Sequence, residues 1–152
     1  MITYVKGNLL EDKAEALVNT VNTVGVMGKG IALAFKQAFP HNFKVYADAC
    51  KNKTLTIGKI LAVRDTNLLY GEKLIINLPT KAHWRQPSEY KYVEAGLIAL
   101  VAYLEANAVR KLALPALGCG SGGLNWNEVM PMMECYLQQI EINISVYMPN
   151  DI

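Results

Sequence analysis

Short apolar segments rich in β-branched residues recur along the chain, each about as long as a β-strand. They lie at residues 2–6, 16–21, 59–65, 73–79, 111–117 and 143–148. Only the sequence TNLLYGE separates the third segment from the fourth, which predicts a hairpin between them. The other intervals are longer and show helical periodicity.

The first two predicted helices follow one another closely. Ile31, Phe35 and Phe39 recur at four-residue spacing, which predicts one amphipathic helix. Pro40 ends it, because proline cannot continue a helix. A second apolar stripe over residues 43–50 predicts the next helix.

Two further helices are predicted in the second half of the chain. The most regular apolar face covers residues 88–107, with Ser88 as the candidate N-cap. A last helix covers residues 129–140, where Asn125 and Glu128 have the spacing that caps a first turn.

Strands that alternate with helices predict a layered α/β domain, and the hairpin makes its sheet mixed. The 152 residues are 52% hydrophobic, enough for one core, and no repeat or linker divides them, so we expect a single domain over residues 1–152. No stretch approaches the roughly 18 apolar residues of a membrane span. The N-terminal MITYVKGNLL is unlike a signal peptide, so the cytoplasm is the expected location and no membrane partner is expected.

Cysteines, histidines and charge narrow the possible chemistry. Cys50, Cys119 and Cys135 are odd in number and widely separated, which argues against a disulfide framework or a paired-cysteine zinc site. His41 and His83 add no metal-ligand spacing, so we expect neither a metal nor a cofactor. The net charge of +2 permits contact with nucleic acid but does not require it.

The stretch VGVMGKGIA places glycines directly before a predicted helix and raises the question of a phosphate-binding loop. It is not a triphosphatase P-loop, because Gly25 and Gly28 are too close together and Lys29 is followed by Gly30 instead of Ser or Thr. The dinucleotide fingerprint does not match either. Two interpretations remain: backbone N–H groups at a helix N-terminus that bind an anion, or a turn whose glycines supply positive φ.

A second glycine-rich stretch, ALPALGCGSGGLNW, favours the first interpretation. It leads from a predicted strand into a helix, and Gly118, Gly120, Gly122 and Gly123 can form a nest of N–H groups. Two such loops can converge at one end of the sheet, where α/β proteins bind ligands.

At this point the sequence resembles a known family. VKGNLLEDKAEALVNTVNTVGVMGKGIALAFKQAFP, NLPTKAHWR and LALPALGCGSGGLNW together resemble a macrodomain, the ADP-ribose-binding fold, over essentially the whole chain. More narrowly, GVMGKGIA, PTK and GCGSGGLNW are similar to DarG-type antitoxin macrodomains, which are related to lysine-dependent ADP-ribosyl glycohydrolases. The resemblance implies a three-layer α/β/α sandwich around a mixed β-sheet. DarG-type proteins usually continue past this domain, so the chain can be the N-terminal part of a longer one.

The resemblance also implies where ADP-ribose lies. Asn8 stands where many macrodomains have an aspartate, and its amide oxygen is expected to accept from the adenine amino group, with Leu9 adding a backbone contact. Asn22 corresponds to the residue that bonds the distal ribose, whereas Asn19 is expected to be structural. Lys29 is not required by a backbone cradle and can be a solvent-facing charge. The other implied substrate-binding residues are Thr20, Val21, Gly28, Gly30, Ile31, Thr80, Leu117, Gly118, Cys119, Gly120, Ser121, Gly122, Gly123 and Leu124.

Lys81 is the expected catalytic residue, since it follows NLPT at the position of the catalytic lysine in the resembling family. Its amine would attack the anomeric carbon of the distal ribose, which requires a pKa below the ordinary value of about 10.4. Related human-type enzymes carry an acidic residue in the second glycine loop, where this chain has Gly122. That departure agrees with the DarG-type pattern and leaves the proton donor open; His83 is a candidate, and equally a phosphate contact.

The segment TKAHWRQPSEYKY mixes cations with aromatic residues, and His83, Trp84 and Arg85 are candidate DNA contacts, although the same pattern fits a loop leading into a helix. In DarG-type proteins the substrate is thymidine that carries ADP-ribose in single-stranded DNA, made by a partner toxin. We therefore expect a DNA ADP-ribosyl glycohydrolase that acts as antitoxin to a cognate ADP-ribosyltransferase. The alternatives are a hydrolase of ADP-ribosylated acidic side chains or O-acetyl-ADP-ribose, and a non-catalytic ADP-ribose reader.

Overall fold

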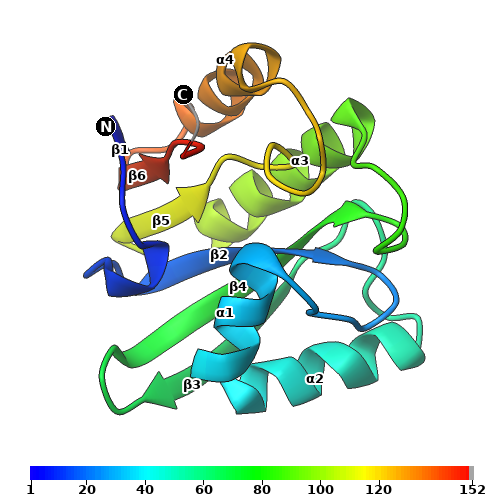
Figure 1. Cartoon of the computed structure of the whole chain (residues 1–152). Coiled ribbons are helices and arrows are strands. Elements are labelled where there is room, and N and C mark those ends of the chain that lie inside the picture. The colour runs from blue at the N-terminus through cyan, green and yellow to red at the C-terminus, as the bar shows by residue number, and fades with distance from the viewer. Residues whose placement is uncertain (151–152) are drawn as a thin grey trace.

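The computed structural model describes residues 1–150, which form a six-stranded mixed sheet (Figure 1). Its strands are β1 (Ile2–Val5), β2 (Ala16–Asn22), β3 (Leu61–Asn67), β4 (Gly71–Lys81), β5 (Lys111–Pro115) and β6 (Asn143–Tyr147). Their order across the sheet is β1-β6-β5-β2-β4-β3. Only β3 runs antiparallel to its neighbour, so the predicted hairpin and the predicted mixed sheet are both confirmed.

Helices cover both faces of this sheet. They are α1 (Gly30–Ala38), α2 (Pro40–Lys51), α3 (Tyr90–Ala106) and α4 (Trp126–Leu137), and a short 3-10 helix, η1 (Leu9–Glu11), follows β1. The helices α1 and α2 lie on one face and α3 and α4 on the other (Figure 1). The three-layer α/β/α sandwich is therefore confirmed.

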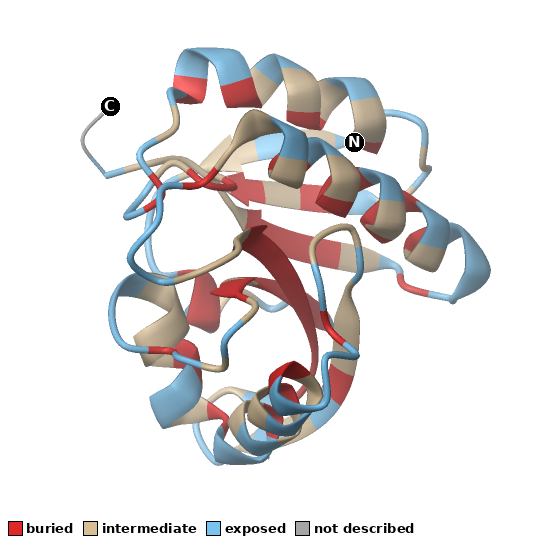
Figure 2. Cartoon of the chain, turned by 90° about the vertical axis from the view of Figure 1, so that its right-hand side faces the viewer, coloured by how far each residue is buried: buried red, intermediate tan, exposed pale blue. Residues whose placement is uncertain are grey.

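The alternation of side chains along the central strands builds both halves of the core. Val18 and Ile76 pack with α3 and α4, whereas their neighbours Leu17 and Ile75 pack with Phe35 and Phe39 of the α1 segment. The central strands are accordingly buried on both sides (Figure 2). Apolar runs without alternation are what such strands require.

The six observed strands differ from the predicted ones by one or two residues, and β3 and β4 differ at both ends. The third strand was expected over residues 59–65 and lies at Leu61–Asn67, and β4 extends two residues beyond its predicted span at each end. The hairpin accounts for the shift, because pairing continues to Asn67 opposite Gly71. Asn67 Oδ1 then accepts hydrogen bonds from the N–H groups of Leu69 and Tyr70, which closes the turn.

The predicted N-cap of α3 is wrong. The cap position is Glu89, and the Ser88 side chain is buried against the second glycine loop instead, so it is not placed at the helix end. The predicted cap of α4 is confirmed, since the Asn125 side chain accepts the Asn127 N–H at 2.9 Å. Proline also behaves as predicted, because α1 ends before Pro40, which becomes the first residue of α2.

Five of the six strands run parallel, so their carboxyl ends meet at one edge of the sheet. Between β5 and β2 the chain order reverses, which is where open α/β sheets bind ligands. None of the helices in residues 1–150 is both long and apolar enough to span a membrane.

Candidate functional site

A cleft of about 800 Å³ lies along the edge where the parallel strands end. Its size is in the range typical of small-molecule sites. Of the residues predicted to bind substrate or react, those lining it are Asn8, Leu9, Thr20, Val21, Asn22, Gly28, Gly30, Ile31, Thr80, Lys81, Gly118, Cys119, Gly120, Ser121 and Gly122. Segments distant in the sequence are thus brought together in one cavity.

Three predicted contacts do not line the cleft. Leu117 is completely buried in the core below the second glycine loop. Gly123 and Leu124 lie where the loop turns back, and the Leu124 N–H donates to Gly118 O at 2.9 Å. The Gly123 N–H likewise donates to Gly120 O, at 3.2 Å, so both residues take part in the turn that closes the loop.

The cleft is also lined by residues that were not predicted from the sequence to bind substrate. They are Gly7, Val26, Lys29, Ala32, Pro115, Ala116, Tyr147, Met148, Pro149 and Asn150. Tyr147 is the most informative, because its hydroxyl donates to Asp12 Oδ2 at 2.7 Å while its ring faces the cavity. Its position at the end of the last predicted parallel strand was the available signal.

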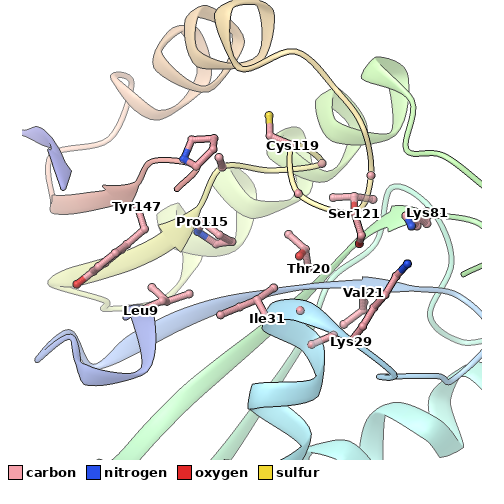
Figure 3. A pocket seen from close by; sticks show the side chains of 18 of the residues that line it. Leu9, Thr20, Val21, Lys29, Ile31, Lys81, Pro115, Cys119, Ser121 and Tyr147 are labelled. Atoms are coloured by element: carbon pink, nitrogen blue, oxygen red, sulfur yellow. The ribbon is translucent and has the colours of Figure 1, made fainter. Parts of the chain in front are cut away.

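The two ends of the cleft differ chemically. Leu9 and Tyr147 lie at one end, and Lys29, Lys81 and Ser121 gather at the other (Figure 3). Near the apolar end, the exposed Asn8 caps η1, its Oδ1 accepting the Leu10 N–H at 3.1 Å. An amide oxygen has two lone pairs, so Asn8 retains capacity for the predicted adenine contact.

A β-bulge shapes the polar end. Pairing between β2 and β4 is regular as far as Val21 opposite Pro79, but the next pair is Asn22 with Lys81, which leaves Thr80 as the extra residue. A bulge bends a strand and redirects a side chain. It places Asn22 beside Lys81 at the edge of the cleft.

The Asn22 side chain organises the loop that follows β2. Its Oδ1 accepts the Val24 N–H at 3.0 Å, and its Nδ2 donates to Val26 O at 2.7 Å. Asn19 has the structural place predicted for it, because it is fully buried and bonds Asn77 Oδ1 at 3.3 Å.

Lys81 carries an amine whose charged form is disfavoured. Partial burial lowers its pKa from the ordinary value, and the positive charge of Lys29 across the cleft lowers it further. The only acceptor found for its Nζ among the described residues is Trp84 O, at a distance of 3.5 Å. The amine is therefore held by one weak bond and is open to a ligand.

Backbone N–H groups line the middle of the cleft on both sides. In the second glycine loop, the N–H groups of Gly120, Ser121 and Gly122 donate to no protein acceptor among the described residues. Opposite them is the N-terminus of α1, where the first N–H groups of a helix have no partner within it. Both features attract anions, and together they form a cradle suited to a pyrophosphate.

Gly122 is held too tightly to carry a side chain. A Cβ at this position would lie 2.5 Å from Gly118 O and would also meet Ser88 Oγ. The place of the acidic residue in the related enzymes is thus sterically closed here. Cys119 lines the cleft and also packs against the core, and burial raises the pKa of its thiol to about 11, so nothing activates it as a thiolate.

The candidate DNA contacts lie at the Lys81 end. The His83 and Trp84 rings stack with centroids 5.5 Å apart, and the Arg85 guanidinium lies 4.5 Å from the centroid of the Trp84 ring. Trp84 lines the cleft and is 42% exposed, whereas His83 and Arg85 lie outside the lining. His83 Nδ1 accepts the Arg85 N–H at 3.1 Å.

No group of three or more His, Cys, Asp or Glu side chains that could hold a metal ion is found within residues 1–150. The polar groups that line the cleft are amides, lysines, hydroxyls and backbone N–H groups, without a carboxylate among the described residues. These suit a phosphorylated ligand better than a cation.

A macrodomain is defined by these layers, the mixed sheet and the cleft between two glycine loops. Residues 18–133 match the Macro domain family model, and the chain belongs to this family. It is 51% identical over 150 residues to a DNA ADP-ribosyl glycohydrolase of Thermus aquaticus, an alignment that covers 98% of this chain and 41% of that protein.

Solved structures agree with this assignment. The macrodomain of Mycobacterium tuberculosis DarG matches with a TM-score of 0.94 and 48% identity over 99% of each chain. Thermosipho africanus DarTG in complex with ADP-ribose matches with a TM-score of 0.92 and 39% identity, over 99% of this chain and 42% of that one. The chain therefore spans less than half the length of the T. aquaticus and T. africanus proteins.

Proposed function

We propose that this chain is a glycohydrolase that removes ADP-ribose from thymidine in single-stranded DNA. The observation that carries the proposal is the pairing of Lys81 with Asn22 after the bulge, where both residues line the polar end of the cleft. An amine with a lowered pKa there is suited to nucleophilic attack.

ADP-ribose would lie along the cleft with its adenine at the Asn8 and Tyr147 end. Its pyrophosphate would accept from the N–H groups of the second glycine loop and of the α1 N-terminus. This leaves the distal ribose between Asn22 and Lys81. The solved complex of the T. africanus relative with ADP-ribose supports this ligand.

The reaction would proceed in two displacements. The neutral Lys81 amine attacks the anomeric carbon, and the bond from that carbon to the thymine nitrogen breaks, its electron pair leaving with the base, which gains a proton. Water then attacks the same carbon and gives one proton to solvent, the bond to Lys81 breaks, and ADP-ribose departs with the neutral amine restored. Gly122 offers no acid and His83 lies outside the cleft lining, so we assign the proton to solvent.

Trp84 supports a nucleic-acid substrate. An exposed indole next to Lys81 provides a surface on which an unpaired base can stack, and Arg85 beside it provides a positive charge for phosphate. The T. aquaticus relative is named for action on DNA, in agreement with this assignment.

The partner we propose is the transferase that modifies the DNA, whose effect this chain would reverse as an antitoxin in the cytoplasm. A T. africanus relative, 41% identical over 162 residues, is named as a fusion of a DNA ADP-ribosyl transferase and a DNA ADP-ribosyl glycohydrolase. A fusion of the two activities in one relative supports their action on the same substrate.

Release of ADP-ribose from single-stranded DNA that carries ADP-ribosyl-thymidine tests the proposal, with an ADP-ribosylated glutamate peptide as the comparison substrate. We expect turnover of the DNA and little or none of the peptide. Lys81→Ala should abolish release while ADP-ribose still binds. Lys81→Arg should also be inactive, because guanidinium stays protonated.

The matched control is Lys44→Ala, which removes an exposed lysine of α2 and should leave turnover unchanged. An active Lys81→Arg enzyme would exclude the nucleophile role. Preferred turnover of the peptide would refute the DNA substrate, and binding without turnover of either would indicate a reader.

A further inference from the structure

Tyr46 contacts the ribose-facing asparagine from behind the cleft. It lies on α2, is completely buried and does not line the cavity. Its hydroxyl donates to both oxygens of Asn22, at 2.8 Å from the backbone O and 2.9 Å from Oδ1. Tyr46 thus links α2 to Asn22, 24 residues away along the chain, and the Cys50 thiol of the same helix adds a weak bond to the Asn22 backbone O at 3.9 Å.

This phenol contributes to the orientation of the Asn22 amide. A carboxamide turned by 180° keeps its shape but exchanges its donors with its acceptor, so its partners decide its orientation. Here Oδ1 accepts hydrogen bonds from the Tyr46 hydroxyl, from the Val24 N–H and, at 3.4 Å, from the Val26 N–H. Nδ2 donates one N–H to Val26 O. The second N–H of Nδ2 meets no protein acceptor among the described residues, and Asn22 lines the cleft.

We propose that Tyr46 is a positioning residue for the glycohydrolase reaction, which holds the Asn22 amide so that its free N–H is directed at the distal ribose. The expected effect on kcat rests on the proposed function. The expected effect on Asn22 orientation requires only that ADP-ribose binds in the cleft. Tyr46 contacts no substrate and acts only through Asn22.

The residues packed around Tyr46 keep its ring and hydroxyl in one position. The ring is fixed by packing against Val21, Met27 and Leu55, and the Phe43 ring lies 6.2 Å away between centroids. Burial raises the pKa of the Tyr46 hydroxyl, so it remains a protonated donor throughout the ordinary pH range. A fixed ring with a permanent donor can hold an amide in one orientation.

A double-mutant cycle separates positioning from packing. Tyr46→Phe keeps the buried ring and removes only the oxygen that contacts Asn22. We expect it to weaken ADP-ribose binding roughly 2- to 10-fold, the range of one neutral hydrogen bond. We expect kcat on ADP-ribosylated DNA to fall further, roughly 10- to 100-fold, because misplacement of a reacting carbon lowers rate more than affinity.

In the Asn22→Ala background the same Tyr46→Phe change should reduce binding and kcat clearly less than in the wild-type background. The side-chain amide is then gone and only the bond to the backbone O of residue 22 remains. Calorimetry with ADP-ribose and turnover of modified DNA provide the two readouts, and thermal unfolding checks that each variant is folded. Tyr4→Phe is the matched control, since it removes a phenol that bonds Glu134 away from the cleft.

Wild-type binding and kcat in Tyr46→Phe, or equal fold-losses in both backgrounds, would overturn the inference. The proposed function is judged separately by turnover of the wild-type chain. If that chain released no ADP-ribose, the affinity cycle would still decide whether Tyr46 acts through Asn22.

Discussion

At the scale of single residues, Lys81 illustrates how burial and one charged neighbour lower the pKa of an amine. The sequence placed it after NLPT, but a lysine in that place is chemically useful only if its amine loses its proton. Partial burial is the first cause of the lowered pKa and the charge of Lys29 the second. Lys29, which the sequence left as a solvent-facing charge, therefore bears on the chemistry from across the cleft.

We predict that Lys29→Met shifts the pH dependence of kcat. Activity rises with pH as Lys81 loses its proton, because the neutral amine is the nucleophile. Removal of the Lys29 charge raises the pKa of Lys81, so the rise of kcat with pH moves to higher pH. Turnover at pH 7 then falls, whereas turnover at high pH approaches that of the wild type.

Lys29→Arg serves as the control for this prediction, because it retains the charge and should retain the wild-type profile. The measurement is a kcat profile at saturating modified DNA. Superimposable profiles for Lys29→Met and the wild type would mean that Lys29 has no influence on the nucleophile.

At the scale of elements, the second glycine loop is set by its contact with the start of α3. The Ser88 N–H donates to Gly122 O at 3.0 Å, and the Ser88 side chain fills the space where a side chain at position 122 would lie. This contact ties the loop to the helical layer. It also explains why Ser88 does not serve as a helix cap.

We predict that Gly122→Ala destabilises the protein and weakens ADP-ribose binding, whereas Gly120→Ala leaves stability unchanged. The Cβ at position 122 would overlap Gly118 and Ser88, and overpacking of this kind costs about 1–3 kcal/mol. A Cβ at position 120 meets no atom within 4 Å. Thermal unfolding of the two variants measures the difference in stability. Equal unfolding temperatures would show that the loop backbone shifts to accommodate the Cβ at position 122.

At the scale of the whole molecule, the cleft forms only when the five parallel strands are assembled, since each strand end supplies part of its lining. A ligand that bridges these ends binds the folded state and not the unfolded chain. Ligand binding and global stability are therefore linked.

We predict that ADP-ribose at about 100 times its Kd stabilises the protein by about 2.7 kcal/mol. For a chain of this size the gain corresponds to a rise in Tm of roughly 5–10 °C. The rise should be the same in excess chelator, because amides, lysines and N–H groups line the site. Loss of the rise on chelation would show that a metal is needed.

The sequence by itself determined the elements and most of the lining. Periodicity located the strands and helices, and glycine content located the two glycine loops, because both are local properties of the chain. Asn22 and Lys81 were located through the resemblance of their surrounding motifs to macrodomains. What it could not determine were contacts between distant segments. The extra residue at Thr80, the Tyr147 ring, Lys29 across from Lys81 and the Tyr46 hydroxyl under Asn22 all arise from strand pairing and helix packing. A local pattern encodes which face of a segment is apolar, but only the folded chain decides which side chains from separate segments meet.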